Sequence, residues 1–256
     1  MRIPVIQGVI DRRVLANWRC DPRAVARLLP PPFRPKLAGG YAIAGVCLIR
    51  LKAIRPRALW APGNIGINSE NAAHRIAVEW DEAGPDGRPV TREGVYIPRR
   101  DSSSRFNTLV GGRLFPGVHH HATFDVREAG DRLHIAVTSD DGAVRLSLDA
   151  RFGTILPPGS VFPDVPTASA FFERGACGYS PGRKAGELQG LELRTLRWEV
   201  QPLEVERASS SFFDDAPRFP PGSAEFDCAL LMRGIEHEWH SREAPRAAAA
   251  VGACAP

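Results

Sequence analysis

The stretch TREGVYIPRRDSSS, residues 91–104, places a strand, two arginines and a helix start next to one another. Residues 91–97 have the pattern of a strand. Asp101 is a suitable helix N-cap, and residues 102–109 can form about two helical turns before Gly111 and Gly112. Backbone N–H groups at a helix start and guanidinium groups both favour a carboxylate or phosphate. Arg99 and Arg100 are therefore predicted to bind an anion, unless they pair with surface carboxylates such as Glu93 or Asp101.

Outward from this stretch, the chain is rich in strand patterns. Residues 74–80 alternate in polarity, and the turn at residues 84–87 predicts a hairpin with residues 90–97. Further strands are predicted at residues 5–10, 14–18, 41–51, 119–126, 134–139, 144–152, 191–205 and 225–232. Short helices are predicted at residues 21–29, capped by Asp21, and at 168–174, capped by Thr167. The predicted fold class is β-rich α+β: an antiparallel β-barrel or curved sheets with a few short peripheral helices.

Composition narrows the classes of protein and partner. The chain has 256 residues, 43% hydrophobic and 24% charged, which is typical of globular domains. Its net charge of +4 is scattered, which predicts no nucleic-acid partner. With no apolar run long enough for a membrane span and no signal-peptide pattern at the start, we expect a cytoplasmic protein without a membrane partner. The five cysteines are widely spaced, which favours neither a disulfide framework nor a zinc site. We expect a single domain over residues 1–242 and a disordered tail over 243–256.

Several strings carry a resemblance to a known family. They are Asn68–Arg75, Glu93–Asp101, Phe115–His121 and Phe212–Asp215. They resemble an uncharacterised bacterial family, domain of unknown function 2071, which looks like a branch of the acetoacetate decarboxylase-like fold. That likeness implies a β-barrel around a small-molecule pocket. Two local matches support it: Trp18–Asp21 before a short helix, and the pair Arg92-Glu93 ahead of Pro98.

The sequence departs from the decarboxylase at the catalytic position. The decarboxylase carries two lysines directly after that proline, and the first forms an imine with the keto acid. Arg99 and Arg100 stand there in this chain, and a guanidinium does not act as an imine-forming amine. Schiff-base decarboxylation is therefore not expected. The resemblance implies a pocket for a small organic (keto) acid, with Arg99, Arg100, Arg19 and Glu93 as binding candidates, no cofactor, and homo-oligomers.

Histidines supply the candidates for proton transfer. In the run His119-His120-His121, alternation places His120 on the face shared with Ala122, which predicts that His120 points into the pocket. A metal site would need further ligands, and no second cluster has a diagnostic spacing, so no metal is predicted. His74 is either a buried core histidine or a base oriented by Glu70. His120, His74 and Glu70 are the catalytic candidates.

Two functions remain open. One is an enzyme that acts on a small acid as a lyase, hydratase or isomerase without an imine. The other is a non-catalytic protein that binds or senses a small acid in the same barrel. Cys47 lies in an apolar run and is predicted to be packed rather than nucleophilic.

Overall fold

The computed structural model describes residues 4–59, 66–110, 116–184 and 186–245. Its strands are β1 (Ile6–Cys20), β2 (Arg34–Pro35), β3 (Leu37–Ala38), β4 (Tyr41–Pro56), β5 (Ile67–Ala83), β6 (Pro89–Ser102), β7 (His119–Ala129), β8 (Arg132–Ser139), β9 (Arg145–Phe152), β10 (Cys177–Pro181), β11 (Leu188–Thr195), β12 (Gln201–Ser210) and β13 (Ala224–Arg242). Its helices are α1 (Pro22–Ala26), α2 (Arg105–Val110) and α3 (Val165–Glu173).

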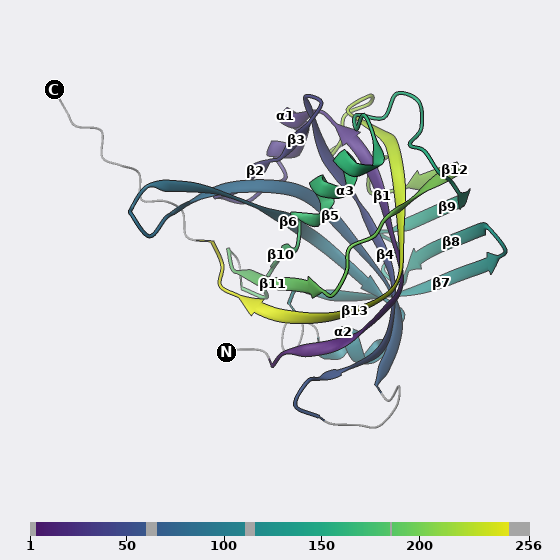
Figure 1. Cartoon of the computed structure of the whole chain (residues 1–256), viewed down its shortest axis with the longest axis horizontal. Helices are drawn as coiled ribbons and strands as arrows, with labels where there is room; N and C mark the ends of the chain where they lie inside the picture. Colours follow the sequence, from purple (N-terminus) through teal and green to yellow (C-terminus); the bar gives the residue numbers. More distant parts are fainter. Residues whose placement is uncertain (1–3, 60–65, 111–115, 185, 246–256) are drawn as a thin grey trace.

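The strands form one 13-stranded mixed sheet that closes on itself twice (Figure 1). One closed path of hydrogen-bonded strands runs β6–β7–β8–β9–β12–β13–β1–β4–β5 and returns to β6; we call it the packed ring. The other runs β6–β10–β11–β13–β1–β4–β5 and returns to β6; we call it the cavity ring. The two rings share a wall made of β13, β1, β4, β5 and β6.

Alternation along the shared wall separates two interiors. Even-numbered residues of β1 and β4, such as Val14 and Val46, belong to the largest buried apolar cluster, together with Ile135 and Leu148 from β8 and β9. This cluster fills the packed ring. Odd-numbered neighbours such as Leu15 pack on the other face, where α3 contributes aromatic side chains to a second cluster. Because both faces of the wall are covered, its strands are buried on both sides.

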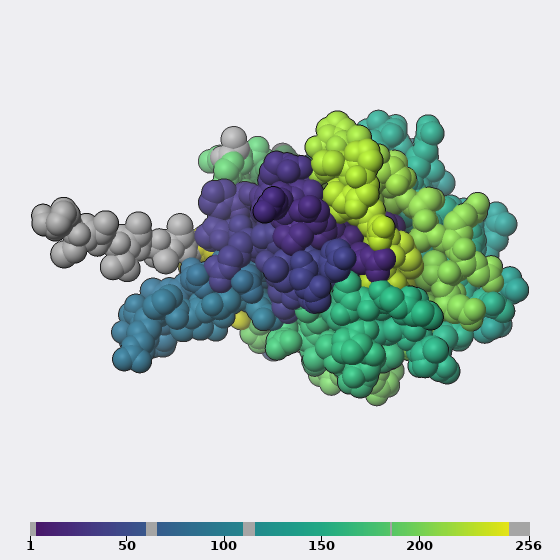
Figure 2. Space-filling model, turned by 90° about the horizontal axis from the view of Figure 1, so that it is seen from above, coloured from purple at the N-terminus to yellow at the C-terminus, as the bar shows by residue number. Residues whose placement is uncertain are grey.

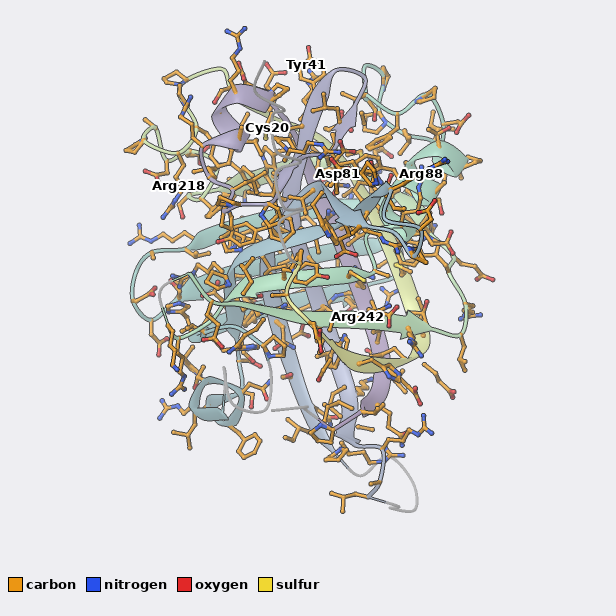
Figure 3. The ribbon with its side chains drawn as sticks, turned by 90° about the vertical axis from the view of Figure 1, so that its left-hand side faces the viewer. Cys20, Tyr41, Asp81, Arg88, Arg218 and Arg242 are labelled. Carbon is orange, nitrogen blue, oxygen red and sulfur yellow. The ribbon has the colours of Figure 1, made fainter. Side chains whose placement is uncertain are left out.

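A long hairpin of β5 and β6 extends from the body of the molecule (Figure 2). Its turn holds Gly87 at a φ of 78°, and the amide of Gly84 donates to the carbonyl of Arg88 at 2.7 Å. A left-handed φ of this kind favours glycine. In the side-chain view, Asp81 and Arg88 of the hairpin lie above Arg242 at the end of β13 (Figure 3). The predicted hairpin between residues 74–80 and 90–97 is therefore confirmed.

Many predicted elements are confirmed. The α+β class, rich in strands with a few short helices, agrees with the structure, and Asp21 caps α1 by accepting from the amides of Arg23 and Ala24. The predicted strands at 5–10 and 14–18 form one strand, β1, whereas the strand predicted at 191–205 is divided into β11 and β12. Both neighbours of β6 outside the hairpin run parallel to it, which corrects the expectation of purely antiparallel pairing, and β10 was not predicted.

Helix starts account for two corrections. Asp101 does not cap a helix: it pairs with Ala72 inside β6, which continues through Ser102. The amide of Asn107 instead donates to Ser104 Oγ at 3.3 Å, and α2 begins at Arg105. The cap of α3 is Asp164, not Thr167, whose amide donates to the Asp164 carboxylate at 2.7 Å. Gly111, Gly112 and residues 246–256 of the predicted tail lie outside the described residues.

Candidate functional site

The interior of the cavity ring holds a cavity of about 140 Å³. Residues of the shared wall, β10 and β11 line it, together with Asn107 of α2 and His119 of β7. Its apolar lining comprises Ile49, Leu51, Ile54, Ile67, Ala73, Val95, Ile97, Leu191, Leu193 and Trp239. Its polar lining comprises Arg13, Cys47, Ser69, Asn71, Arg75, Arg100, Asp101, Asn107 and His119. The described lining thus combines a mainly aliphatic wall with three guanidinium groups.

Strand register explains how the three arginines meet. Leu15, Cys47, Ala73 and Arg100 form one row across β1, β4, β5 and β6, because each pairs directly with the next. Arg13 and Arg75 lie in the two flanking rows on the same face, since side chains alternate along a strand. Ala73 is small, so the middle of this row leaves space between Cys47 and Arg100.

Arg75 crosses the wall over a glycine. It pairs with Gly45 of β4, which in turn pairs with Asn17 of β1, and Arg75 Nη2 donates to Asn17 Oδ1. A β-carbon added to Gly45 would lie 2.2 Å from the carbonyl oxygen of Ala16, so this position of the wall has no room for a side chain. The Arg75 guanidinium also stacks on Phe172 of α3, with 4.9 Å from its carbon to the ring centre.

Among the described residues, the side chains of Arg100 and Arg13 each donate one hydrogen bond, to an uncharged group. Arg100 Nε donates to Ser180 Oγ at 3.1 Å, and Arg13 Nε donates to Cys47 Sγ at 3.3 Å. Gly117, at a φ of 83°, brings the chain against Ser180 and the Arg100 guanidinium: an added β-carbon there would lie 2.8 Å from Ser180 Cβ. The adjoining turn is thus packed directly on Arg100.

No carboxylate in the described part of the chain forms an ion pair with Arg13, Arg75 or Arg100. Burial lowers the pKa of Arg75 to about 10 and the pKa of Arg100 to about 10, because a low-dielectric interior disfavours the charged form. Both groups remain protonated at neutral pH. The cavity therefore carries positive charge that the surrounding described residues do not neutralise.

Arg99 lies on the opposite face of β6 from Arg100. Its guanidinium donates to Asp101 at 2.7 Å and to Asp141 at 2.9 Å, as in the alternative of pairing with nearby carboxylates. The reason is a bulge. Tyr96 pairs with Ile76 and Arg99 pairs with His74, so β6 has an extra residue between these pairs. The bulge shifts the alternation by one residue and turns Arg100, rather than Arg99, toward the cavity.

His119, not His120, borders the cavity, which corrects the predicted orientation. β7 pairs parallel to β6 with His119 opposite Arg100, and the apolar face of β7 packs into the packed ring. His119 Nε2 donates to the carbonyl of Pro116 at 3.2 Å, and burial, followed by the charge of Arg100, lowers the pKa of His119 to about 3. The side chain of His120 is 37% exposed and lies 3.1 Å from Asp141.

Glu70 does not orient His74. The Glu70 carboxylate accepts from Arg12 at 2.6 Å and from Arg50 at 2.6 Å. His74 is fully buried on the packed-ring face and packs on Phe212 with ring centres 4.5 Å apart. Among the described residues neither ring nitrogen has a hydrogen-bond partner, and Nδ1 lies 4.0 Å from the Asp101 carboxylate. Burial lowers the pKa of His74 to about 3, which agrees with the buried-core alternative rather than with a base at the pocket.

The other two binding candidates lie away from the cavity lining. Arg19 donates from Nε and Nη2 to one oxygen, Glu225 Oε2, at 2.6 Å for the shorter bond, and from Nη1 to the carbonyl of Gly159. Glu93 accepts from the buried amine of Lys36 at 2.6 Å. Both side chains therefore have structural partners, and neither lines the cavity with Arg100.

Sequence reasoning missed Arg13, Arg75 and the position of Cys47. Arg75 belongs to the string Asn68–Arg75 that carries the family resemblance, but the alternation of residues 74–80 puts it on the face opposite His74. The signal that could have identified it is the unbroken apolar run of β4, in which residues 42–48 are all buried. Such a run is typical of a strand covered on both faces, which gives its neighbours two interiors.

Neither a metal-binding cluster nor a membrane-spanning helix is present among the described residues. They contain no group of three histidine, cysteine, aspartate or glutamate side chains arranged to hold a metal ion. Within the same ranges, no helix has the length and apolar character needed to cross a bilayer.

Comparison with known proteins identifies the family. Residues 10–235 match the family described as an uncharacterised conserved protein, domain of unknown function 2071. The chain belongs to this family. No curated protein matches the sequence. The DUF2071 match spans β1 through most of β13 and includes all three cavity arginines.

Solved structures place this DUF2071 chain among acetoacetate decarboxylase-like folds. Acetoacetate decarboxylase from Legionella pneumophila is 9% identical, with a TM-score of 0.55 over 93% of this chain and 86% of that one. The enduracididine biosynthesis enzyme MppR, with HEPES bound, is 14% identical, with a TM-score of 0.55 over 95% and 87%. An acetoacetate decarboxylase-like enzyme from Sphingomonas wittichii is 13% identical, with a TM-score of 0.51 over 94% and 93%. At these identities the likeness establishes the fold.

Proposed function

We propose that this protein binds a small carboxylic acid, with a 2-oxo acid as the leading class, in the cavity of the cavity ring. The observation that carries the proposal is the meeting of Arg13, Arg75 and Arg100 without an ion-paired carboxylate among the described residues. An unpaired buried charge costs several kcal/mol, about 3–5 when a buried ion pair loses one partner. A bound carboxylate offsets that cost by accepting charge-assisted hydrogen bonds, for which the guanidinium fork is well suited.

Cavity size limits the ligand. A volume of about 140 Å³ is comparable to an engineered cavity in another protein, about 150 Å³, that binds benzene. A ligand of about five to nine non-hydrogen atoms therefore fits this space. The aliphatic wall favours a short apolar or ketone-bearing body behind the carboxylate.

The lining also restricts the chemistry. Within the described lining no lysine is present, so imine formation has no nucleophile there. Besides the arginines and Cys47, His119 is the titratable side chain of the described lining that faces the cavity, because the Asp101 carboxylate lies with Arg99 on the other face of β6. Burial raises the pKa of Asp101, and Arg99 counteracts this shift. His119 is then the candidate for a proton transfer on the bound acid, as in a lyase, hydratase or isomerase step without an imine.

A non-catalytic binding or sensing role is the second candidate. It is favoured by the engagement of Asp101 with Arg99 at 2.7 Å and by the low pKa of His119, since both limit proton transfer near neutral pH. Acid exchange separates the two candidates. Incubation of a bound 2-oxo acid in D₂O gives protein-dependent loss of its C3–H signals by NMR if a base acts on it, and unchanged signals if the protein only binds.

Matched acids and amides test the binding itself. Thermal stability is measured with propionate, pyruvate, 2-oxobutyrate and benzoate, each against its neutral amide. A ligand at 100 times its dissociation constant stabilises the folded state by about 2.7 kcal/mol. We expect stabilisation by acids of the stated size and none by the amides. Equal effects of acid and amide, or no effect of any acid, contradict the proposal.

We also propose, separately, that copies of this chain associate with one another. Phe106 and Leu109 of α2 and Val118 are large apolar side chains with 49%, 73% and 46% exposure. Light scattering over a range of protein concentrations tests whether copies associate.

A further inference from the structure

Cys47 lies at the centre of the cationic wall of the cavity. It is 8% exposed, lines the cavity from β4, and accepts a hydrogen bond from Arg13 Nε at 3.3 Å. Its direct neighbour on β5 is Ala73, which pairs in turn with Arg100 on β6. Arg75 of β5 lies in the flanking row on the same face. The thiol therefore faces a space bordered by all three guanidinium groups.

A second observation points to a ligand beside this thiol. Arg75 is 4% exposed, and its Nε has no hydrogen-bond partner among the described residues. Arg13 Nη1, on the other side of Cys47, is likewise buried without a hydrogen-bond partner in the same ranges. Both groups line the cavity. Donors that remain unsatisfied at this depth indicate an acceptor supplied from outside the described chain.

The surroundings of Cys47 differ from those of the other buried cysteines. Cys20 and Cys228 are packed away from the cavity, and burial raises the pKa of the Cys20 thiol to about 12 and that of Cys228 still further. In contrast, Cys47 lies beside guanidinium groups: it bonds to Arg13, and Arg75 and Arg100 border the same cavity. Positive neighbours favour a nucleophilic thiol, whereas an apolar setting makes a cysteine inert.

We propose that Cys47 is a nucleophile that adds reversibly to the carbonyl carbon of a small 2-oxo or aldehyde acid in the cavity. The inference rests on the proposed function, because the arginines would hold the acid's carboxylate beside the sulfur. A sulfur electron pair forms the new C–S bond, and the π pair of the C=O bond moves to its oxygen. The thiol proton passes to that oxygen. The product is a hemithioacetal or hemithioketal, with no leaving group and no change of oxidation state.

A pair of alkylating reagents that match in shape and differ in charge tests the electrostatic surroundings of the thiol. Iodoacetate and iodoacetamide have nearly the same shape, and each forms a C–S bond with loss of iodide, but only iodoacetate is an anion. The folded protein is treated with each reagent, and peptide mass spectrometry follows every cysteine, so that Cys20 and Cys228 serve as internal controls. Charged clefts raise association rates by about 10-fold to 1,000-fold.

We expect iodoacetate to modify Cys47 at least about tenfold faster than iodoacetamide, and the preference to disappear in Arg13→Met. Faster reaction with iodoacetamide, or modification of Cys47 only in denaturant, overturns the proposal.

Carbon NMR tests the addition itself. With [2-¹³C]pyruvate, we expect a resonance of a tetrahedral carbon bonded to oxygen and sulfur in the wild type, and its loss in Cys47→Ser. A pyruvate that stabilises the protein but gives only ketone and hydrate signals overturns carbonyl addition.

Propionate separates this inference from the proposed function, because it has no carbonyl that can accept the thiol. Stabilisation of both wild type and Cys47→Ser by propionate, without thiol addition to pyruvate, retains acid binding and overturns the role of Cys47. Lack of stabilisation by propionate and benzoate, together with a strong iodoacetate preference and the pyruvate adduct, supports the reactive thiol and overturns acid binding by the arginines alone. Lack of both overturns both.

Discussion

Replacement of Arg100 by methionine is expected to stabilise the ligand-free protein and to weaken acid binding. Arg100 is held by one neutral hydrogen bond, to Ser180, and no described carboxylate pairs with it. Methionine has a similar length, suits the aliphatic wall, and brings no charge. The charge that would bind the acid is therefore a cost to the empty protein.

The magnitude follows from the pKa of Arg100. Burial lowers it from 12.5 to about 10. A cationic group whose pKa is lower in the folded state than in the unfolded state destabilises the fold whenever it is protonated. The penalty is fully present at pH 7 and is relieved only as the pH rises from about 10 toward 12.5. The shift corresponds to about 3 kcal/mol, an upper bound because water in the cavity screens the charge and Ser180 loses its partner. We expect a net gain of about 1–2 kcal/mol, or roughly 2–8 °C in Tm.

The neighbouring arginine provides a control of opposite sign. Arg99 bonds to Asp101, which is 1% exposed, and to Asp141. Arg99→Met leaves the buried Asp101 carboxylate without its guanidinium and is expected to cost about 3 kcal/mol. Urea denaturation at pH 7 measures both stabilities, and calorimetry with pyruvate and propionate measures binding. A destabilised Arg100→Met protein, or one that binds acids as tightly as the wild type, refutes the reasoning.

Two further predictions concern the residues on the packed-ring side. His74→Phe should keep the fold, since His74 already stacks on Phe212. It should also flatten the loss of stability on acidification: with a pKa of about 3 in the fold against 6.5 unfolded, His74 costs stability as the pH falls below 6.5, about 2 kcal/mol by pH 5. An unchanged difference between denaturation at pH 7.5 and pH 5 would contradict this. Glu70→Gln should cost about 2–3 kcal/mol because Arg12 and Arg50 lose a charged acceptor, while acid binding measured by calorimetry stays the same; weakened binding would indicate that Glu70 does belong to the site.

The strand-rich fold class could be predicted because local signals agree with one another. The alternation of residues 74–80, the glycine turn after them and the Asp21 cap are all determined by contacts within a few residues, and each is confirmed. The parallel pairings of β6 with β7 and β10 could not be predicted in this way. They join segments separated by loops and helices, and no short-range pattern specifies which distant strand lies beside a given edge.

The candidate site was predicted in part, and the errors come from the assumption that each strand has one interior face and an unbroken alternation. The paired arginines were identified, but alternation alone does not tell which of the two faces the cavity. That choice depends on the bulge in β6 between Tyr96 and Arg99, which inverts the alternation ahead of Arg100. The same assumption, that a strand has one interior face, placed His74 and His120 toward the ligand. In the shared wall of two rings, the face opposite an apolar stripe can also be an interior.

This shared wall accounts for the separation of stability from binding. On one face, Val14, Val46 and Ile76 join an apolar cluster that extends over most of the packed ring, and each buried side chain of this kind contributes about 1.5–3 kcal/mol. On the other face, the same strands hold Arg13, Arg75 and Arg100, and an unpaired charge that is buried as deeply as Arg75 costs a few kcal/mol. Because the cluster contains many more buried apolar side chains than the wall has cavity arginines, the wall stays folded without a ligand. The three arginines are therefore already in position before an anion binds, and the site needs no folding step on binding. The acid's binding energy is not reduced by a cost of ordering the wall.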